Sequence, residues 1–300
     1  MSTTGVRHGH WQWKISEGLR TGLHRFLSLL LFSPMNVALS GLSVLAISFL
    51  LYNIPINPML LSAAFLVTFS VYTLNLTTDK QEDTVNSPER AHYFFTDIRL
   101  LVAIAFGCYF AAILIGGMVS LSSIPVLCIP LALGLLYSIR IRNMRLKDMF
   151  VGKNTTVSLS WALVASLLPA VFVVHTPVVF LILSFIFLKG LINTILFDVR
   201  DIRGDTTAHI STFPSRLGIP TTRALLLGLN SLLLVWLMFA VQQTTFLFYL
   251  PVFVFCLAYG YFYIFYLTHN TSVPKLYYGL LLDGEWMLLL VLFLLSLWIL

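Results

Sequence analysis

The chain has 300 residues, of which 58% are hydrophobic and only 10% are charged, and its formal net charge is +6. Soluble domains carry about 25% charged residues, so this composition excludes a soluble fold as well as disordered, collagen-like and disulfide-scaffold proteins. The sequence predicts an integral membrane protein whose basic residues set its orientation and do not bind nucleic acid.

Nine apolar segments are long enough to cross a bilayer as helices, since a crossing needs roughly 20 mostly apolar residues. The predicted spans cover residues 35–52, 58–75, 100–117, 122–138, 156–174, 177–197, 221–241, 245–267 and 279–299. The sequence therefore predicts an all-α, polytopic membrane protein. We divide it into a cytoplasmic or interfacial amino-terminal segment, residues 1–34, and a nine-helix membrane domain, residues 35–300. The amino-terminal segment fits either a surface helix or a continuation of the first span.

The links between the spans differ in charge. Several short links, such as residues 53–57 and 175–176, contain no Lys or Arg, whereas the links after spans two, four, six and eight carry them. Because cytoplasmic loops collect Lys and Arg, this pattern places the amino terminus and the basic links in the cytoplasm. We expect a multi-pass protein of a prokaryotic plasma membrane.

Two polar clusters follow spans two and six on the predicted cytoplasmic side. Each has three side chains that are three or four residues apart, which places them on one face of a helix. The clusters are Asn75, Asp79 and Asp83, and Asp198, Asp201 and Asp205.

Carboxylates stacked at this spacing repel one another unless a cation neutralises them. Oxygen ligands without Cys or His favour Mg²⁺, which commonly shares its coordination sphere with substrate phosphates. The clusters therefore predict diphosphate chemistry at one membrane face. The alternative is a pair of solvated loops whose aspartates pair with Lys80, Arg200 and Arg203.

The two clusters resemble the aspartate motifs of the UbiA superfamily of intramembrane prenyltransferases. The resemblance extends to the nine spans and to Tyr137-Ser138, which precede a basic loop. It implies a helical bundle with a central cavity that is open to the cytoplasmic side and to lipid. It also implies that each cluster binds one Mg²⁺ ion and that the two ions hold a prenyl diphosphate. The catalytic residues by position are Asp79, Asp83, Asp201 and Asp205.

Four further residues are expected to contact the substrate. Arg140 and Lys147 lie in the basic loop that resembles the diphosphate-binding segment of the family. Tyr72 precedes Asn75 by about one helical turn, and Tyr137 ends span four, so both are expected to line the pocket.

Lys189 is a charged residue near the middle of span six, about 13 Å from Asp198 along a helix at 1.5 Å per residue. A buried ammonium group needs a partner or a function. We assign it to substrate binding, and the alternatives are pairing with Asn193 or extension of the side chain towards the membrane surface.

We therefore predict Mg²⁺-dependent transfer of an isoprenyl group from its diphosphate to a lipophilic or aromatic acceptor, in quinone, polar-lipid or carotenoid biosynthesis. The expected partners are the donor, the acceptor and membrane lipid, and the active site faces the cytoplasm. One alternative is an intramembrane terpene cyclase. Another is a cation-coupled secondary transporter, although transporters usually bind their ions near the bilayer midplane.

Overall fold

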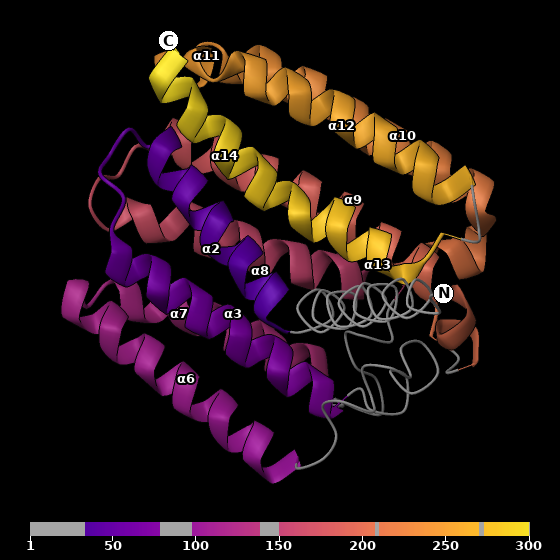
Figure 1. Ribbon diagram of the computed structural model, residues 1–300, viewed down its shortest axis with the longest axis horizontal. Helices are drawn as coiled ribbons and strands as arrows, with labels where there is room; N and C mark the ends of the chain where they lie inside the picture. Colours follow the sequence, from indigo (N-terminus) through magenta and orange to yellow (C-terminus); the bar gives the residue numbers. More distant parts are fainter. Residues whose placement is uncertain (1–33, 79–97, 139–149, 208–209, 270–272, 300) are drawn as a thin grey trace, which may run out of the picture.

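A computed structural model describes residues 34–78, 98–138, 150–207, 210–269 and 273–299 (Figure 1). Every regular element within these ranges is a helix, so the all-α prediction is confirmed for them. The elements are α2 (Pro34–Leu51), α3 (Pro58–Thr78), α6 (Ile98–Val119), α7 (Ser123–Ser138), α8 (Gly152–Ala170), α9 (Thr176–Thr207), α10 (Phe213–Ala240), α11 (Thr244–Phe248), α12 (Leu250–His269), α13 (Lys275–Tyr278), the π-helix η2 (Gly279–Asp283) and α14 (Gly284–Ile299). Residues 1–33 of the predicted interfacial segment lie outside these ranges, and its last residue, Pro34, begins α2.

Each predicted span coincides with a helix in the described ranges, but only 7 helices there are long and apolar enough to cross a membrane by these criteria. The two that fall short are α7, with 16 residues, and α8, which has 19 residues but is less apolar. Ser158 and Ser166 of α8 are buried, and their hydroxyls donate to carbonyls of the same helix. The chain is a multi-pass membrane protein, and the number of nine crossings stays a prediction.

The long helices form two rows (Figure 1). In one row α6 packs on α3, α3 on α2, and α2 on α14. In the other row α7 packs on α8, α8 on α9, α9 on α10, and α10 on α12. Contacts of α3 with α7 and of α2 with α8 join the rows. The end of α3, the start of α8 and the end of α9 therefore lie at the same end of the bundle.

Large apolar side chains remain exposed on the outside of the bundle. Phe106, Phe110 and Met118 of α6 are exposed, as is Trp298 of α14. Contiguous apolar surface of this kind is not stable in water and marks contact with lipid.

Helix α9 continues past the end of the predicted membrane span. The predicted span ends at residue 197, but the helix continues to Thr207 and carries the second carboxylate cluster on its last turns. Helix α10 then begins at Phe213, where Thr212 and Ser215 form a capping box, and Gly218 with φ 76° allows the chain to bend before Pro220. The second cluster therefore lies on a helix, as its spacing of three and four residues predicts.

Candidate active site

The second carboxylate cluster lies on one side of the last turns of α9. Asp198 and Asp205 are almost fully buried, with 1% and 2% of their surface exposed. Two carboxylates seven residues apart are two helical turns apart and project in the same direction. Buried carboxylates need hydrogen bonds or a cation to offset the loss of water.

The first turn of α8 supplies both. The ammonium of Lys153 lies 2.8 Å from Asp198 Oδ1 and 3.6 Å from Asp205 Oδ2. Asn154 donates from Nδ2 to Asp198 Oδ2 at 2.8 Å. A single cation is thus held between two carboxylates that come from one face of α9.

The third carboxylate of the cluster has a different neighbour. Arg200 forms a bidentate hydrogen-bonded pair with Asp201: its Nε donates to Oδ1 at 2.9 Å and its Nη2 donates to Oδ2 at 2.6 Å. The guanidinium of Arg200 also lies 4.6 Å from the centre of the Phe197 ring. Both partners are partly exposed, so this pair is more accessible than the pair formed by Lys153 and Asp198.

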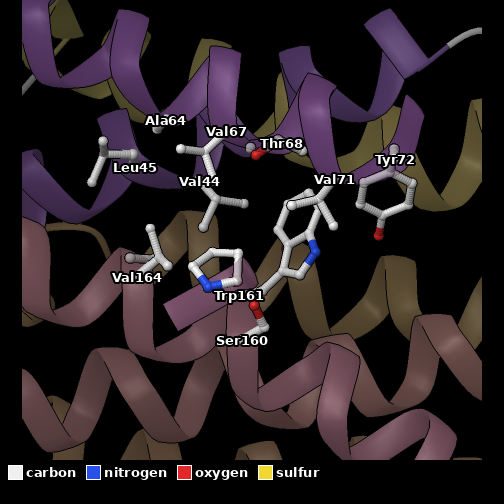
Figure 2. Close-up of a pocket in the computed structure, with 13 residues that line it drawn as sticks. Val44, Leu45, Ala64, Val67, Thr68, Val71, Tyr72, Ser160, Trp161 and Val164 are labelled. Carbon is white, nitrogen blue, oxygen red and sulfur yellow. The ribbon is translucent and has the colours of Figure 1, made fainter. Parts of the chain in front are cut away.

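An apolar cavity with a volume of about 50 Å³ lies between α2, α3, α7 and α8. Figure 2 shows Tyr72 and Trp161 near one end and Leu45 and Ala64 towards the other. The rings of Tyr72 and Trp161 meet edge to face with their centres 6.5 Å apart. Because Asn75 lies one turn beyond Tyr72 on α3, the end of the cavity at Tyr72 is the end nearer Asn75.

Lys189 lies in a separate buried cluster. Its ammonium is fully buried and lies 2.6 Å from Glu285 Oε1 and 2.6 Å from the hydroxyl of Tyr263. The same Tyr263 hydroxyl donates a hydrogen bond to Asn193 Oδ1 at 3.4 Å. Lys189 is not among the residues that line the cavity next to Tyr72.

The sequence profile described as the UbiA prenyltransferase family matches residues 43–282. The chain belongs to the UbiA prenyltransferase family. This assignment confirms the resemblance inferred from the two aspartate motifs. The comparison with curated proteins finds no match.

Solved structures of UbiA proteins have the same fold. A UbiA homologue from Archaeoglobus fulgidus bound to GPP and Mg²⁺ has a TM-score of 0.68 at 14% identity, over 90% of this chain and 99% of the homologue. A structure of an A. fulgidus UbiA homologue bound to DMAPP and Mg²⁺ has a TM-score of 0.66 at 14% identity, over 91% and 99% of the two chains. A digeranylgeranylglyceryl phosphate synthase has a TM-score of 0.58 at 14% identity, over 90% and 95%.

Part of the predicted UbiA site lies outside the described residues. This applies to Asp79, Asp83, Arg140 and Lys147, and to the side chain of Tyr137 at the end of α7. Within the described ranges, no three His, Cys, Asp or Glu side chains are grouped closely enough to hold a metal ion. The complete metal site therefore stays a prediction, of which Asp198, Asp201, Asp205 and Asn75 are described.

The described residues of the predicted set carry oxygen donors of the kind that bind a divalent cation. The buried oxygens of Asp198 and Asp205 already share one positive charge, that of Lys153. Every side chain of the predicted set would bind a metal ion through an oxygen atom, and oxygen is the ligand atom that Mg²⁺ prefers.

The sequence does not single out two contacts of this site. Asn154, which orients Asp198, carries no charge that would mark it. Lys153 is one of seven basic residues that the sequence offers as diphosphate contacts, and nothing ranks it above the others. In the separate cluster around Lys189, the partner Glu285 does have a sequence signal, because a carboxylate inside an apolar span is usually paired with a charge of opposite sign. The substrate-binding role of Lys189 stays a prediction.

Proposed function

We propose that this UbiA protein transfers a prenyl group from a prenyl diphosphate to a lipophilic or aromatic acceptor in the membrane. The observation that carries the proposal is the pair of buried carboxylates, Asp198 and Asp205, that share the ammonium of Lys153. The apolar cavity beside Tyr72 supports a hydrocarbon substrate. The A. fulgidus homologues bound to GPP or DMAPP with Mg²⁺ support this class of donor and this metal.

The residues proposed to hold Mg²⁺ belong to the two polar clusters that follow spans two and six. They are Asn75, Asp79, Asp83, Asp198, Asp201 and Asp205. When bound, Mg²⁺ supplies Lewis acidity to the departing diphosphate oxygens. Asn154 holds the Asp198 carboxylate in a fixed orientation, which reduces the reorganisation needed when a ligand binds.

The protein's own side chains stabilise both products of the bond cleavage. The allylic carbon–oxygen bond breaks, the electron pair leaves with diphosphate, and the prenyl group becomes a carbocation. Lys153 lies beside the carboxylates, so its ammonium stabilises the charge that develops on diphosphate. The ring faces of Tyr72 and Trp161 are electron-rich and stabilise a nearby cation, while the apolar cavity excludes water. The acceptor then forms the new bond and loses a proton.

Arg140 and Lys147 are retained as proposed diphosphate contacts, and Tyr137 as a proposed pocket residue. Their positions in the basic loop and at the end of α7 support this assignment. In the sequence the basic links directly follow the spans that carry these residues, which supports an active site on the cytoplasmic side.

Product analysis tests the proposed function. Purified protein is incubated with Mg²⁺, radiolabelled GPP and a lipid extract, and the labelled products are identified. We expect diphosphate release together with label attached to an acceptor lipid or aromatic compound. A labelled cyclic terpene formed without acceptor would identify a cyclase. Absence of diphosphate release, with solute flux across proteoliposomes driven by an ion gradient, would identify a transporter and contradict the proposal.

Labelling of introduced cysteines tests the proposed orientation. Membrane-impermeant reagent added from outside is expected to label positions 57, 120 and 176, and not positions 86, 143 and 207, because Lys and Arg concentrate on the side of the latter. External labelling at position 86 would place the first cluster on the wrong face and contradict the orientation.

Lys153→Met is expected to lower turnover roughly 100-fold, because it removes one preorganised cation from the departing diphosphate. Steady-state kinetics with GPP gives the change, and Lys153→Arg is expected to recover part of it. The matched control is Arg223→Met, which removes the same charge from α10, where Arg223 binds Thr268 of α12. Equal losses in Lys153→Met and Arg223→Met would contradict the role of Lys153.

A further inference from the structure

A buried polar network lies at the junction of α9, α12 and α14. We define the junction network as Lys189 and Asn193 of α9, Cys256 and Tyr263 of α12, and Glu285 of α14. All five side chains are buried. The Glu285 carboxylate accepts hydrogen bonds from the ammonium of Lys189 at 2.6 Å, from the hydroxyl of Tyr263 at 3.4 Å and from the thiol of Cys256 at 3.6 Å.

Such a network fixes how three membrane helices are placed relative to one another. Apolar side chains pack against lipid about as well as against protein, so they favour no single register between helices. A buried ion pair is different, because rotation or sliding of either helix separates the charges in a medium that cannot solvate them. The pair of Lys189 and Glu285 therefore fixes both the rotation and the height of α9 against α14.

The same network continues to the π-helix and from there to α2. Asn193 Nδ2 donates to the carbonyl of Leu282 at 3.4 Å, within η2. The next carbonyl, that of Asp283, accepts a hydrogen bond from Ser40 Oγ of α2 at 2.8 Å. A π-turn changes the carbonyl pairing of its helix and is often found at functional sites. Here both carbonyls are bonded by side chains of other helices.

These contacts connect the two halves of the candidate active site. Asn193 lies five residues before Asp198 on the same helix, and Ser40 precedes Gly41, which lines the apolar cavity. Asn193 and Ser40 both bond η2, which therefore links the helix that carries the carboxylates to the helix that lines the cavity. The ion pair between Lys189 and Glu285 stands at the centre of this arrangement.

We propose that Lys189 and Glu285 are positioning residues, which set the register of α9 so that its carboxylates meet Lys153, the metal and the donor. This inference rests on the proposed function for the identity of the ligand. It assigns the junction network a role in metal-dependent donor binding, although none of its described contacts is made to the cavity.

Two variants remove the ion pair in different ways. Glu285→Gln keeps the size of the side chain and removes its charge. The double variant Lys189→Met/Glu285→Leu replaces the pair with apolar groups, a change that commonly restores stability but restores no directional contact. The matched control is Leu289→Ala, which removes packing from a buried position one turn further along α14.

Two measurements separate register from general stability. Spin labels at positions 206 and 277, which are exposed on α9 and α13, report the distance between these helices in a protein with Cys108 and Cys128 replaced by Ala and the buried Cys256 retained. Calorimetry reports the binding of a non-hydrolysable GPP analogue at fixed Mg²⁺. Thermal unfolding in detergent is recorded for every variant.

Both ion-pair variants are expected to broaden the distance distribution and to weaken analogue binding by roughly tenfold or more, as loss of supporting contacts around metal ligands does. The double variant should do so with near-normal thermal stability. Leu289→Ala should lower thermal stability and leave both readouts unchanged. If the double variant keeps the parental distance distribution, or if Leu289→Ala alters it equally, the positioning role is overturned.

The two proposals fail in different ways. If the parent protein binds no analogue but the distance still responds to loss of the ion pair, the register role is supported and the proposed function is contradicted. If the parent binds the analogue and the ion-pair variants bind it equally well, the positioning role is wrong and the proposed function is unaffected.

Discussion

Asp201→Asn and Asp205→Asn are each expected to lower prenyl transfer by roughly two orders of magnitude or more, because each removes an anionic ligand from the group that stabilises the departing diphosphate. An amide keeps the size of the side chain and removes the negative charge. For Asp205 the change also removes one of the two carboxylates that share the ammonium of Lys153. Initial rates with GPP at saturating Mg²⁺ provide the measurement.

The matched control for these variants is Thr206→Val on the same turn of α9. Thr206 is exposed, and its hydroxyl donates to the carbonyl of Ile202 within the helix. This variant should retain near-normal activity. The insertion and purification of all three variants should resemble those of the parent. Near-normal turnover in both aspartate variants would mean that α9 does not carry the metal site.

Much of the fold follows from the distribution of apolar residues. Runs of roughly 20 apolar residues have one stable arrangement in lipid, a helix that satisfies its own backbone. Helix ends were harder to predict, since a helix does not have to stop where its apolar run stops. The end of α9 carries charges, yet it continues to Thr207 because Lys153 and Asn154 of α8 stabilise its carboxylates.

The two helices that fall short of the spanning criteria, α7 and α8, show another limit of hydropathy. Helix α8 contains several Ser and Thr residues, which lower its mean hydropathy. Buried hydroxyls such as that of Ser158 donate a hydrogen bond to a carbonyl of the preceding turn, so a helix in the interior of the bundle tolerates them. The number of crossings cannot be obtained from composition alone when helices face protein and not lipid.

Spacing along the chain identified the carboxylate clusters, but it could not identify their partners. Spacing of three and four residues places Asp198 and Asp205 on one face, whatever that face meets. The partner Lys153 is 45 residues from Asp198, and Glu285 is 96 residues from Lys189. Such pairs depend on how helices are rotated against one another, and rotation is decided by packing that a single sequence does not display.

Loss of donor binding is the second large effect, and it concerns whether the two polar clusters form one site. Asp79 and Asp198 are 119 positions apart in the sequence, and α3 and α9 lie in different rows of the bundle. One cluster alone supplies too few ligands for two metal ions and a diphosphate, whereas two clusters that face each other would together supply enough oxygen ligands. Both clusters should then be required for binding.

The most direct measurement is the Mg²⁺-dependent binding of a non-hydrolysable GPP analogue to the parent protein, to Asp83→Asn, to Asp201→Asn and to the double variant. We expect each single variant to weaken binding strongly and the double variant to be scarcely weaker, because groups that act as a unit are not additive. Thr206→Val should bind like the parent. Additive losses in the double variant, or binding that survives in Asp83→Asn, would show that the clusters are independent and would contradict a single prenyl diphosphate site.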